Sequence, residues 1–163
     1  TLLDGSQVDA RSIEPGDAAA LASFHKALSP DSRRRRFFSF HPQLTERELD
    51  YFSRVDHTDR EAFVVLDREI LIGVGRYDRV APNTAEVAFV VADEWHSRGI
   101  ATCLLNLLAE RARAVGIDTF VADTLGDNAP MLEVFAHWST ARSVTYDDGI
   151  AHVEMPLPLT QPF

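Results

Sequence analysis

The sequence predicts an α/β domain in which helices flank a mixed, twisted sheet. Three observations predict this class. Residues 84–115 have the pattern of a strand, a turn and a helix. Two pairs of β-branched runs surround turn residues at 67–69 and 147–149, which is typical of hairpins. Helix-start signals recur in the first fifty residues and again at 127.

The expected elements follow one another without a linker or an internal repeat, so residues 1–163 are expected to form one domain. The first part is expected to form a strand over 7–13, a helix from Pro15 with Leu21, Phe24 and Leu28 on one face, a short helix after Ser29 and Pro30, and a third helix capped by Thr45 and Glu48. Strands over 62–66 and 70–77, a strand from 84 and a helix over 100–115 follow. The last part is expected to form a strand over 117–122, a helix from Asp127 to about His137, and strands over 143–146 and 150–155. The tail 156–163 contains three prolines and is expected to be an irregular arm.

The unit at 84–115 organises the rest. Both faces of its strand are mostly apolar, which predicts an interior strand covered on two sides, and Glu86 is the one charge within it. Apolar residues then recur at helical spacing, and Gly116 ends the helix. The apolar positions are 100, 103, 104, 107, 108, 112 and 115. The first turn, 96–101, leaves backbone N–H groups free, which predicts an anion site; the alternative is a helix start with a small residue for packing.

Composition excludes several classes. The formal charge of −9 argues against nonspecific nucleic-acid binding and is compatible with a cationic amine as acceptor. No apolar run approaches the roughly 18 residues of a membrane span, and no signal peptide opens the chain. A single cysteine, Cys103, allows no internal disulfide and favours a reducing cytoplasm. The histidines lack ligand spacing, so no metal is expected.

The turn His96-Ser97-Arg98-Gly99-Ile100-Ala101 resembles the Gln/Arg-x-x-Gly-x-Gly/Ala motif of GNAT acyl-CoA-dependent N-acetyltransferases. Gly99 and Ala101 fit this motif, whereas His96 departs from it. The expected element order is also that of GNAT proteins. The segments LSPDSRRRRFF, HPQLTERELDYFSRVDH, GVGRYDR and AEVAFVVAD resemble the catalytic domain of bacterial Pat-type protein lysine acetyltransferases. The resemblance covers nearly the whole chain and implies a GNAT fold.

The resemblance also implies acetyl-CoA as cosubstrate. In the family the amides of this turn cradle the pyrophosphate of coenzyme A, and a backbone N–H of the central strand stabilises the oxyanion, which points here to Val90 and Val91. Asn128 either hydrogen-bonds the pantetheine arm or caps the last helix. The implied cofactor-binding residues are Phe89, Val90, Val91, His96, Ser97, Arg98, Gly99, Ile100, Ala101, Thr102 and Asn128.

Glu86 is the expected catalytic base. A lysine amine has a pKa of about 10.4, so the enzyme must accept its proton. The small Ala88 and Ala92 on the same strand face leave room for a substrate, and Glu86 matches the strand glutamate that acts as base in Pat-like enzymes; the alternative is that Glu86 marks an exposed strand end. Many family members protonate the leaving thiolate with a tyrosine, but Phe135 occupies that place here. Cys103 is expected to fill the core, which disfavours an acyl-cysteine route.

Other residues keep two interpretations. Arg33 to Arg36 either bind the coenzyme's 3′-phosphate or an acidic protein partner, or form a solvated helix face. His57 either borders the acceptor cleft or lies in a solvated loop, and Trp95 and Trp138 are expected to be packing anchors. After the last helix the chain has HWSTAR at 137–142 where the family usually has Gly-Phe, which indicates a reshaped acceptor side.

The expected function is transfer of an acetyl group from acetyl-CoA to the ε-amine of a protein lysine, for example in a metabolic enzyme. The amine is expected to attack directly in a ternary complex, and the expected location is the cytoplasm. Neither a nucleic acid nor a membrane is expected as a partner. A fused or separate regulatory domain is an expected partner. One alternative is a small-molecule amine N-acetyltransferase, since only the acceptor cleft would differ. Another is a noncatalytic acyl-CoA-binding regulatory module.

Overall fold

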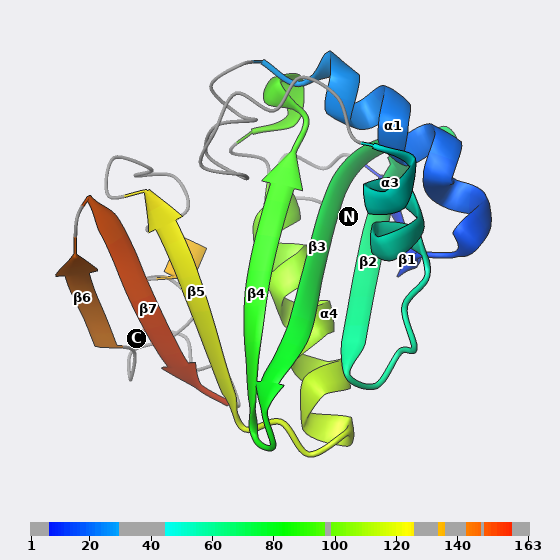
Figure 1. The fold of residues 1–163 in the computed structure, drawn as a ribbon. Helices are drawn as coiled ribbons and strands as arrows, with labels where there is room; N and C mark the ends of the chain where they lie inside the picture. Colours follow the sequence, from blue (N-terminus) through cyan, green and yellow to red (C-terminus); the bar gives the residue numbers. More distant parts are fainter. Residues whose placement is uncertain are drawn as a thin grey trace.

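The computed structural model describes residues 7–29, 45–96, 99–125, 134–135, 143–147 and 149–157. Within them the chain forms a seven-stranded sheet in the order β1-β2-β3-β4-β5-β7-β6, flanked by helices (Figure 1). The elements are β1 (Asp9–Ser12), η1 (Pro15–Asp17), α1 (Ala18–Ala27), α3 (Glu46–Ser53), β2 (Arg60–Asp67), β3 (Ile70–Ala81), β4 (Thr84–Val91), η2 (Asp93–Trp95), α4 (Ile100–Ala114), β5 (Thr119–Leu125), β6 (Ser143–Asp147) and β7 (Ile150–Pro156). The predicted mixed sheet flanked by helices is therefore confirmed.

Strands β4 and β5 pair in parallel, whereas the other pairings between the described strands are antiparallel. The β4–β5 pairing is short. It joins Thr84 to Thr119, Ala85 to Phe120 and Glu86 to Val121, and no further residues of the two strands. Figure 1 shows β4 and β5 meeting at one end and diverging toward the other. Beyond Glu86, one edge of β4 is therefore not hydrogen-bonded to a neighbouring strand in this sheet.

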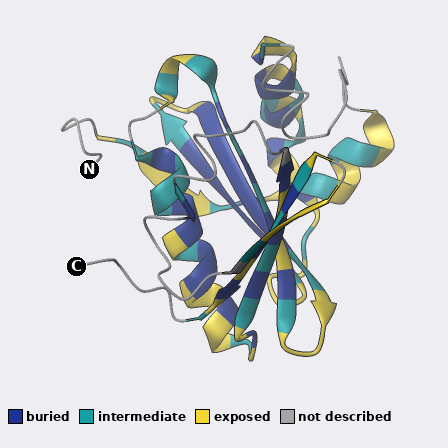
Figure 2. Ribbon diagram, turned by 90° about the vertical axis from the view of Figure 1, so that its left-hand side faces the viewer, coloured by how far each residue is buried: buried dark blue, intermediate teal, exposed yellow. Residues whose placement is uncertain are grey.

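Helices pack on both faces of the sheet. Helix α4 covers one face of β2, β3 and β4, and the larger cluster of buried side chains lies between them. Helices α1 and α3 lie over the other face, above a second cluster that includes Ile13, Phe24 and Val64. In Figure 2 the buried residues follow the strands and the inward sides of the helices, while exposed residues mark the outer sides. Helices α1 and α3 sit toward the β1–β3 side of the sheet, so β5, β7 and β6 carry exposed side chains on that face.

Several local predictions are confirmed at the level of hydrogen bonds. Thr45 and Glu48 form the capping box of α3, with Glu48 N donating to Thr45 Oγ1 over 3.1 Å and Thr45 N donating to Glu48 Oε1 over 3.0 Å. Gly116, at φ +87°, ends α4: Ile117 N donates to Ala112 O over 2.9 Å, and Gly116 N donates to Arg113 O over 3.2 Å. Only a residue that tolerates a left-handed backbone closes the helix in this way.

Other expectations need correction. Strands β2 and β3 are longer than expected and run over Arg60–Asp67 and Ile70–Ala81, and η2 was not expected. Strand β5 begins at Thr119 rather than at 117, and Pro156 belongs to β7 rather than to the arm. The buried side of α4 includes Leu105 and Ala109, whereas Cys103 and Leu107 are only half-buried. The buried positions keep helical spacing, but the buried face is turned toward Leu105 and Ala109 and away from Cys103 and Leu107.

The prediction that β4 is covered on two sides is wrong for one face. Ala85, Val87, Phe89 and Val91 are buried against α4, but Glu86 on the other face is exposed and Ala88 and Val90 are half-buried. The reason is that α1 and α3 lie over β1 to β3 and leave this part of β4 partly open.

Some predictions fall outside the described residues. These are the short helix after Ser29 with Arg33 to Arg36, most of the helix from Asp127 with Asn128, His137 and Trp138, the segment 137–142, the turn residues Ser97 and Arg98, and residues 158–163 of the arm. Ser29 itself is described, and its side chain hydrogen-bonds Asp93 Oδ1 over 3.0 Å.

Candidate active site

The unpaired edge of β4 presents alternate backbone groups. Ala92 N donates to Ile72 O over 2.8 Å, so Ala92 faces β3, whereas Asn83 O faces β5 and accepts from Thr119 N over 3.2 Å. Because successive residues of a strand alternate in direction, Phe89 and Val91 direct their N–H and C=O groups toward the open edge, and Val90 directs its own toward β3. Val90 therefore does not supply the predicted oxyanion N–H, because β3 uses its backbone; Val91 remains a candidate, and Phe89 joins it as a donor.

The start of α4 lies beside this edge. Gly99 caps the helix with φ +94°, a backbone that residues with a side chain rarely adopt, and its carbonyl accepts from Cys103 N over 3.0 Å. The N–H groups of Ile100, Ala101 and Thr102 belong to the first turn, where a helix has no internal partner for them. A Cβ atom on Gly73 of β3, which pairs with Val91, would lie 2.9 Å from Ile100 Cγ2, so the first residue of α4 packs closely on β3 beside the end of β4.

The strand edge and the helix start together suit an elongated ligand. An arm containing amide groups can pair with the Phe89 and Val91 backbone as an added strand would, and a phosphate can meet the first-turn N–H groups of α4. The packing interpretation of the turn is confirmed by Ile100, which is buried in the core, and packing of this side chain is compatible with an anion at the backbone N–H groups of the same turn. Acetyl-CoA has this form, with an amide-containing arm joined to a pyrophosphate, so the described part of the predicted cofactor site fits it.

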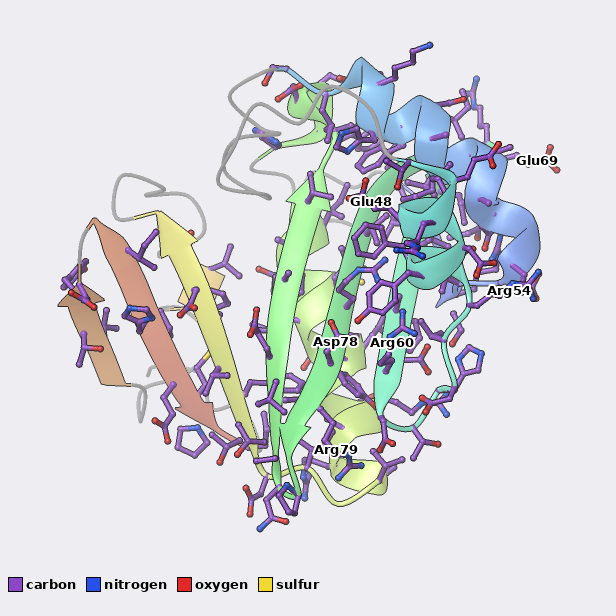
Figure 3. The ribbon with its side chains drawn as sticks, viewed as in Figure 1. Glu48, Arg54, Arg60, Glu69, Asp78 and Arg79 are labelled. Atoms are coloured by element: carbon purple, nitrogen blue, oxygen red, sulfur yellow. The ribbon has the colours of Figure 1, made fainter. Side chains whose placement is uncertain are left out.

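Glu86 stands at the last paired position before β4 and β5 part. It is exposed on the face opposite α4, directly across from Asp78 of β3 and Val121 of β5. Asp78 in turn lies 3.2 Å from Arg60, measured from Oδ1 to Nε, and Figure 3 shows these two residues on β3 and β2. A solvent-accessible carboxylate therefore stands at the point where β4 and β5 part.

A pair that sequence reasoning missed lies on the same face. His152 Nδ1 of β7 is 2.5 Å from Asp123 Oδ1 of β5, two positions beyond Val121 and thus on the side of Glu86. Glu154 also lies on this face and is exposed. The pair is 29 residues apart in sequence, so only the β5–β7 register joins it. Glu86, Asp123 and Glu154 thus place three carboxylates on one face of β4, β5 and β7, with Asp123 paired to His152.

A second missed cluster lies on the α4 side, away from the opening. Glu61 is fully buried; its Oε1 is 2.8 Å from His57 Nδ1, and its Oε2 is 3.5 Å from Arg111 Nε of α4. Burial, reinforced by the Glu61 charge, raises the pKa of neighbouring Tyr77 to about 12. Of the two interpretations of His57, the exposed loop residue is confirmed and the border of an acceptor cleft is not, since the ring contacts Glu61 on the face of the sheet opposite to Glu86. No local sequence signal distinguishes a buried glutamate in a strand from an exposed one.

Phe135 and Trp95 behave as expected, whereas Cys103 is less buried than expected. Cys103 is half-buried, and burial raises the pKa of its thiol, which disfavours a thiolate nucleophile. Phe135 is buried with its ring centroid 6.3 Å from that of Phe89, so it packs in the core and offers no hydroxyl. Trp95 packs against the same core, as predicted.

Neither a metal cluster nor a membrane helix is found in the described ranges. Among residues 7–29, 45–96, 99–125, 134–135, 143–147 and 149–157, no three His, Cys, Asp or Glu side chains are grouped so that they could hold a metal ion. Of the helices in that same part of the chain, none has the length and apolar character needed to cross a membrane.

Comparison with known proteins agrees with this geometry. Residues 23–138 match the model of the acetyltransferase (GNAT) family. The chain is 31% identical over 152 residues to "Acetyltransferase Pat" of Mycolicibacterium smegmatis, an alignment that covers 91% of this chain and 45% of that protein. Less than half of the relative's length is therefore represented here.

Solved structures give the same result. The GNAT domain of S. lividans PAT superposes with a TM-score of 0.90 at 32% identity, covering 96% of this chain and 94% of that one. A cAMP-binding acyltransferase from Mycobacterium smegmatis superposes with a TM-score of 0.69 at 26% identity, covering 99% of this chain and 48% of that one. The family match over most of the chain, together with the strand edge and the glycine-capped helix, establishes that this chain belongs to the GNAT family of acetyltransferases.

Proposed function

We propose that this domain transfers an acetyl group from acetyl-CoA to the ε-amine of a lysine in a protein substrate, by direct attack in a ternary complex. The observation that carries the proposal is Glu86, exposed at the point where β4 and β5 part. The similarity to Pat acetyltransferases supports a lysine acceptor. When bound, acetyl-CoA supplies the acetyl group activated as a thioester.

Each part of the site has an assigned role. The first-turn amides of Gly99 to Thr102 would hold the pyrophosphate, with Gly99 allowing the backbone to approach closely. Ser97 and Arg98 stay in the proposal because they belong to the turn that resembles the family motif, and Asn128 stays either as a ligand of the pantetheine arm or as a helix cap. The N–H groups of Phe89 and Val91 would stabilise negative charge that develops on a carbonyl oxygen held at the open edge.

Glu86 would accept a proton from the lysine ammonium, directly or through water, because only the neutral amine has a lone pair for attack. The acidic surroundings of the opening, with Asp123 and Glu154 on the same face, would favour the approach of a cationic side chain. Cys103 takes no part, because its thiol is partly buried and mostly protonated near neutral pH.

The test is the acetylation rate of a Glu86→Gln variant with a lysine-rich protein and acetyl-CoA. Gln keeps the shape but cannot accept the proton, so the rate should fall about 100-fold or more while acetyl-CoA affinity is unchanged. The matched control is Glu110→Gln, which changes an exposed glutamate of α4 and should leave the rate unchanged. Undiminished turnover by the Glu86 variant would remove this residue from the mechanism.

The same assay separates the alternatives. Turnover on small amines but not on proteins would identify a small-molecule N-acetyltransferase, and tight acetyl-CoA binding without turnover on any amine would identify a regulatory module. We further propose that a fused or separate regulatory domain controls the activity, since one relative that is described as cAMP-binding is about twice as long. Turnover by these 163 residues alone would show that the chemistry does not require such a domain.

A further inference from the structure

His96, the position at which the chain departs from the family motif, makes one specific contact. Its Nε2 atom lies 2.9 Å from the carbonyl oxygen of Val91. A carbonyl oxygen only accepts hydrogen bonds, so the ring must carry a hydrogen on Nε2 and donate it. The tautomer is thereby assigned from the contact, and the contact connects a side chain of the turn with the backbone of the strand.

The accepting carbonyl belongs to the open edge of β4. Val91 is the last residue of that strand, and its N–H and C=O groups face away from β3, as the alternation of the ladder requires. The intervening residues form η2, in which Trp95 N donates to Ala92 O over 2.9 Å and His96 N donates to Asp93 O over 3.3 Å. The His96 ring therefore turns back over η2 and closes a loop between the end of β4 and the end of η2.

Asp93 anchors the same connection from the other side. Its carboxylate accepts from Ser29 N over 2.8 Å and from Ser29 Oγ over 3.0 Å, which ties η2 to the end of α1. With η2 held there, the His96 contact sets the position of the turn relative to the Val91 carbonyl. That carbonyl has a second lone pair, so it can still receive an amide N–H from a bound arm.

We propose that His96 is a positioning residue for acetyl-CoA, acting through the Val91 carbonyl rather than by touching the reacting atoms. Its Nε2–H fixes the end of the open strand edge relative to the helix start, so that one elongated ligand meets both parts of its site in register. The inference rests on the proposed binding of acetyl-CoA. It also explains why histidine can occupy this position of the motif, since the positioning role requires a hydrogen-bond donor at the place of Nε2 and not one particular side chain.

Two variants of His96, in which an amide nitrogen replaces one or the other ring nitrogen, test whether Nε2 is the atom that acts. The amide nitrogen of Gln lies about where histidine Nε2 lies, whereas the amide nitrogen of Asn lies nearer to Nδ1. His96→Gln should therefore keep acetyl-CoA affinity, and His96→Asn and His96→Ala should both raise the Kd about fivefold, the loss of one hydrogen bond. Calorimetric titration with acetyl-CoA measures this, and circular dichroism at the same temperature checks that each variant is folded.

Steady-state kinetics supply a second measurement, because a residue with a purely structural role would not change KM for acetyl-CoA alone. The Ala and Asn variants should raise KM for acetyl-CoA with kcat nearly unchanged, and the Gln variant should restore the wild-type KM. Equal affinities for the Gln and Asn variants, or a wild-type Kd in the Ala variant, would overturn the inference. If wild-type protein does not bind acetyl-CoA, the proposed function fails first, so the two failures are distinguishable. If the Ala variant does not fold, the Gln and Asn comparison still decides.

Discussion

Replacing Gly75 by alanine should destabilise the domain, because the new methyl group has no room. Gly75 lies in β3 directly opposite Phe89 of β4, and a Cβ built there would be 2.8 Å from Phe89 Cδ1 and 3.1 Å from Leu104 Cβ of α4. Overpacking of this kind costs about 1 to 3 kcal/mol, and the reduced entropy of the unfolded chain returns about 0.4 to 1 kcal/mol. We expect a net loss of about 1 to 2 kcal/mol in the free energy of unfolding, which corresponds to a decrease in Tm of about 2 to 8 °C for a domain of this size.

Urea denaturation at neutral pH measures the loss, with Gly16→Ala as the matched control. A Cβ atom on Gly16 would have no other atom within 4 Å, so this variant should be as stable as wild type or slightly more stable. The Phe89→Leu change should relieve the clash, so that the Gly75→Ala, Phe89→Leu double variant is more stable than the sum of the single changes predicts. A Gly75 variant as stable as the Gly16 control, or strictly additive effects, would refute the assignment of the cost to Phe89.

Three further predictions concern single residues. Gly99→Ala should weaken acetyl-CoA binding in a calorimetric titration, because φ at +94° strains any residue with a Cβ; unchanged affinity would count against the anion site. Hydrogen bonding to Arg11 lowers the pKa of Asp17 in the folded state. The ionised carboxylate therefore stabilises the fold at a pH above its pKa in the unfolded chain, and this stabilisation is lost as the pH falls through its pKa in the folded protein. Asp17→Asn should therefore unfold at lower urea than wild type at pH 7, by about 1 to 2 kcal/mol, and the difference should shrink as the pH falls below the usual range of a carboxyl; a difference of the same size in acid and at neutral pH would contradict this. In an ultraviolet alkaline titration Tyr77 should ionise only at about pH 12, and complete titration of all tyrosines by pH 11 in folded protein would contradict it.

The local elements were predictable because their signals are local. The capping box at Thr45 and Glu48, the left-handed Gly116 after α4 and the strand–turn–helix unit all depend on neighbouring residues, and all are present in the structure. The motif around Gly99 was also visible, since a glycine at a helix start has a direct backbone consequence. These features were sufficient to assign the fold class and to place Glu86 in the central strand.

Contacts between distant segments were not predictable in the same way. His152 and Asp123 meet because β5 and β7 pair in one antiparallel register, and Glu61 lies 3.5 Å from Arg111 because α4 packs on that face of β2. The direction of each β4 backbone group depends on which neighbour pairs with it, and for that reason the prediction of Val90 as an oxyanion donor is wrong. A one-residue change in register would exchange the roles of Phe89 and Val90.

By itself, the sequence determined the order of the described strands and longer helices, the glycine at the start of α4 and the identity of the one charge in the central strand. Tertiary structure decided the rest: that β4 and β5 pair over three residues and then part, that Glu86 faces solvent, and that His96 reaches the Val91 carbonyl. The physical reason is that propensity, capping and turn chemistry act between near neighbours in the chain, whereas exposure, strand edges and ion pairs are properties of surfaces that exist only once the layers have packed.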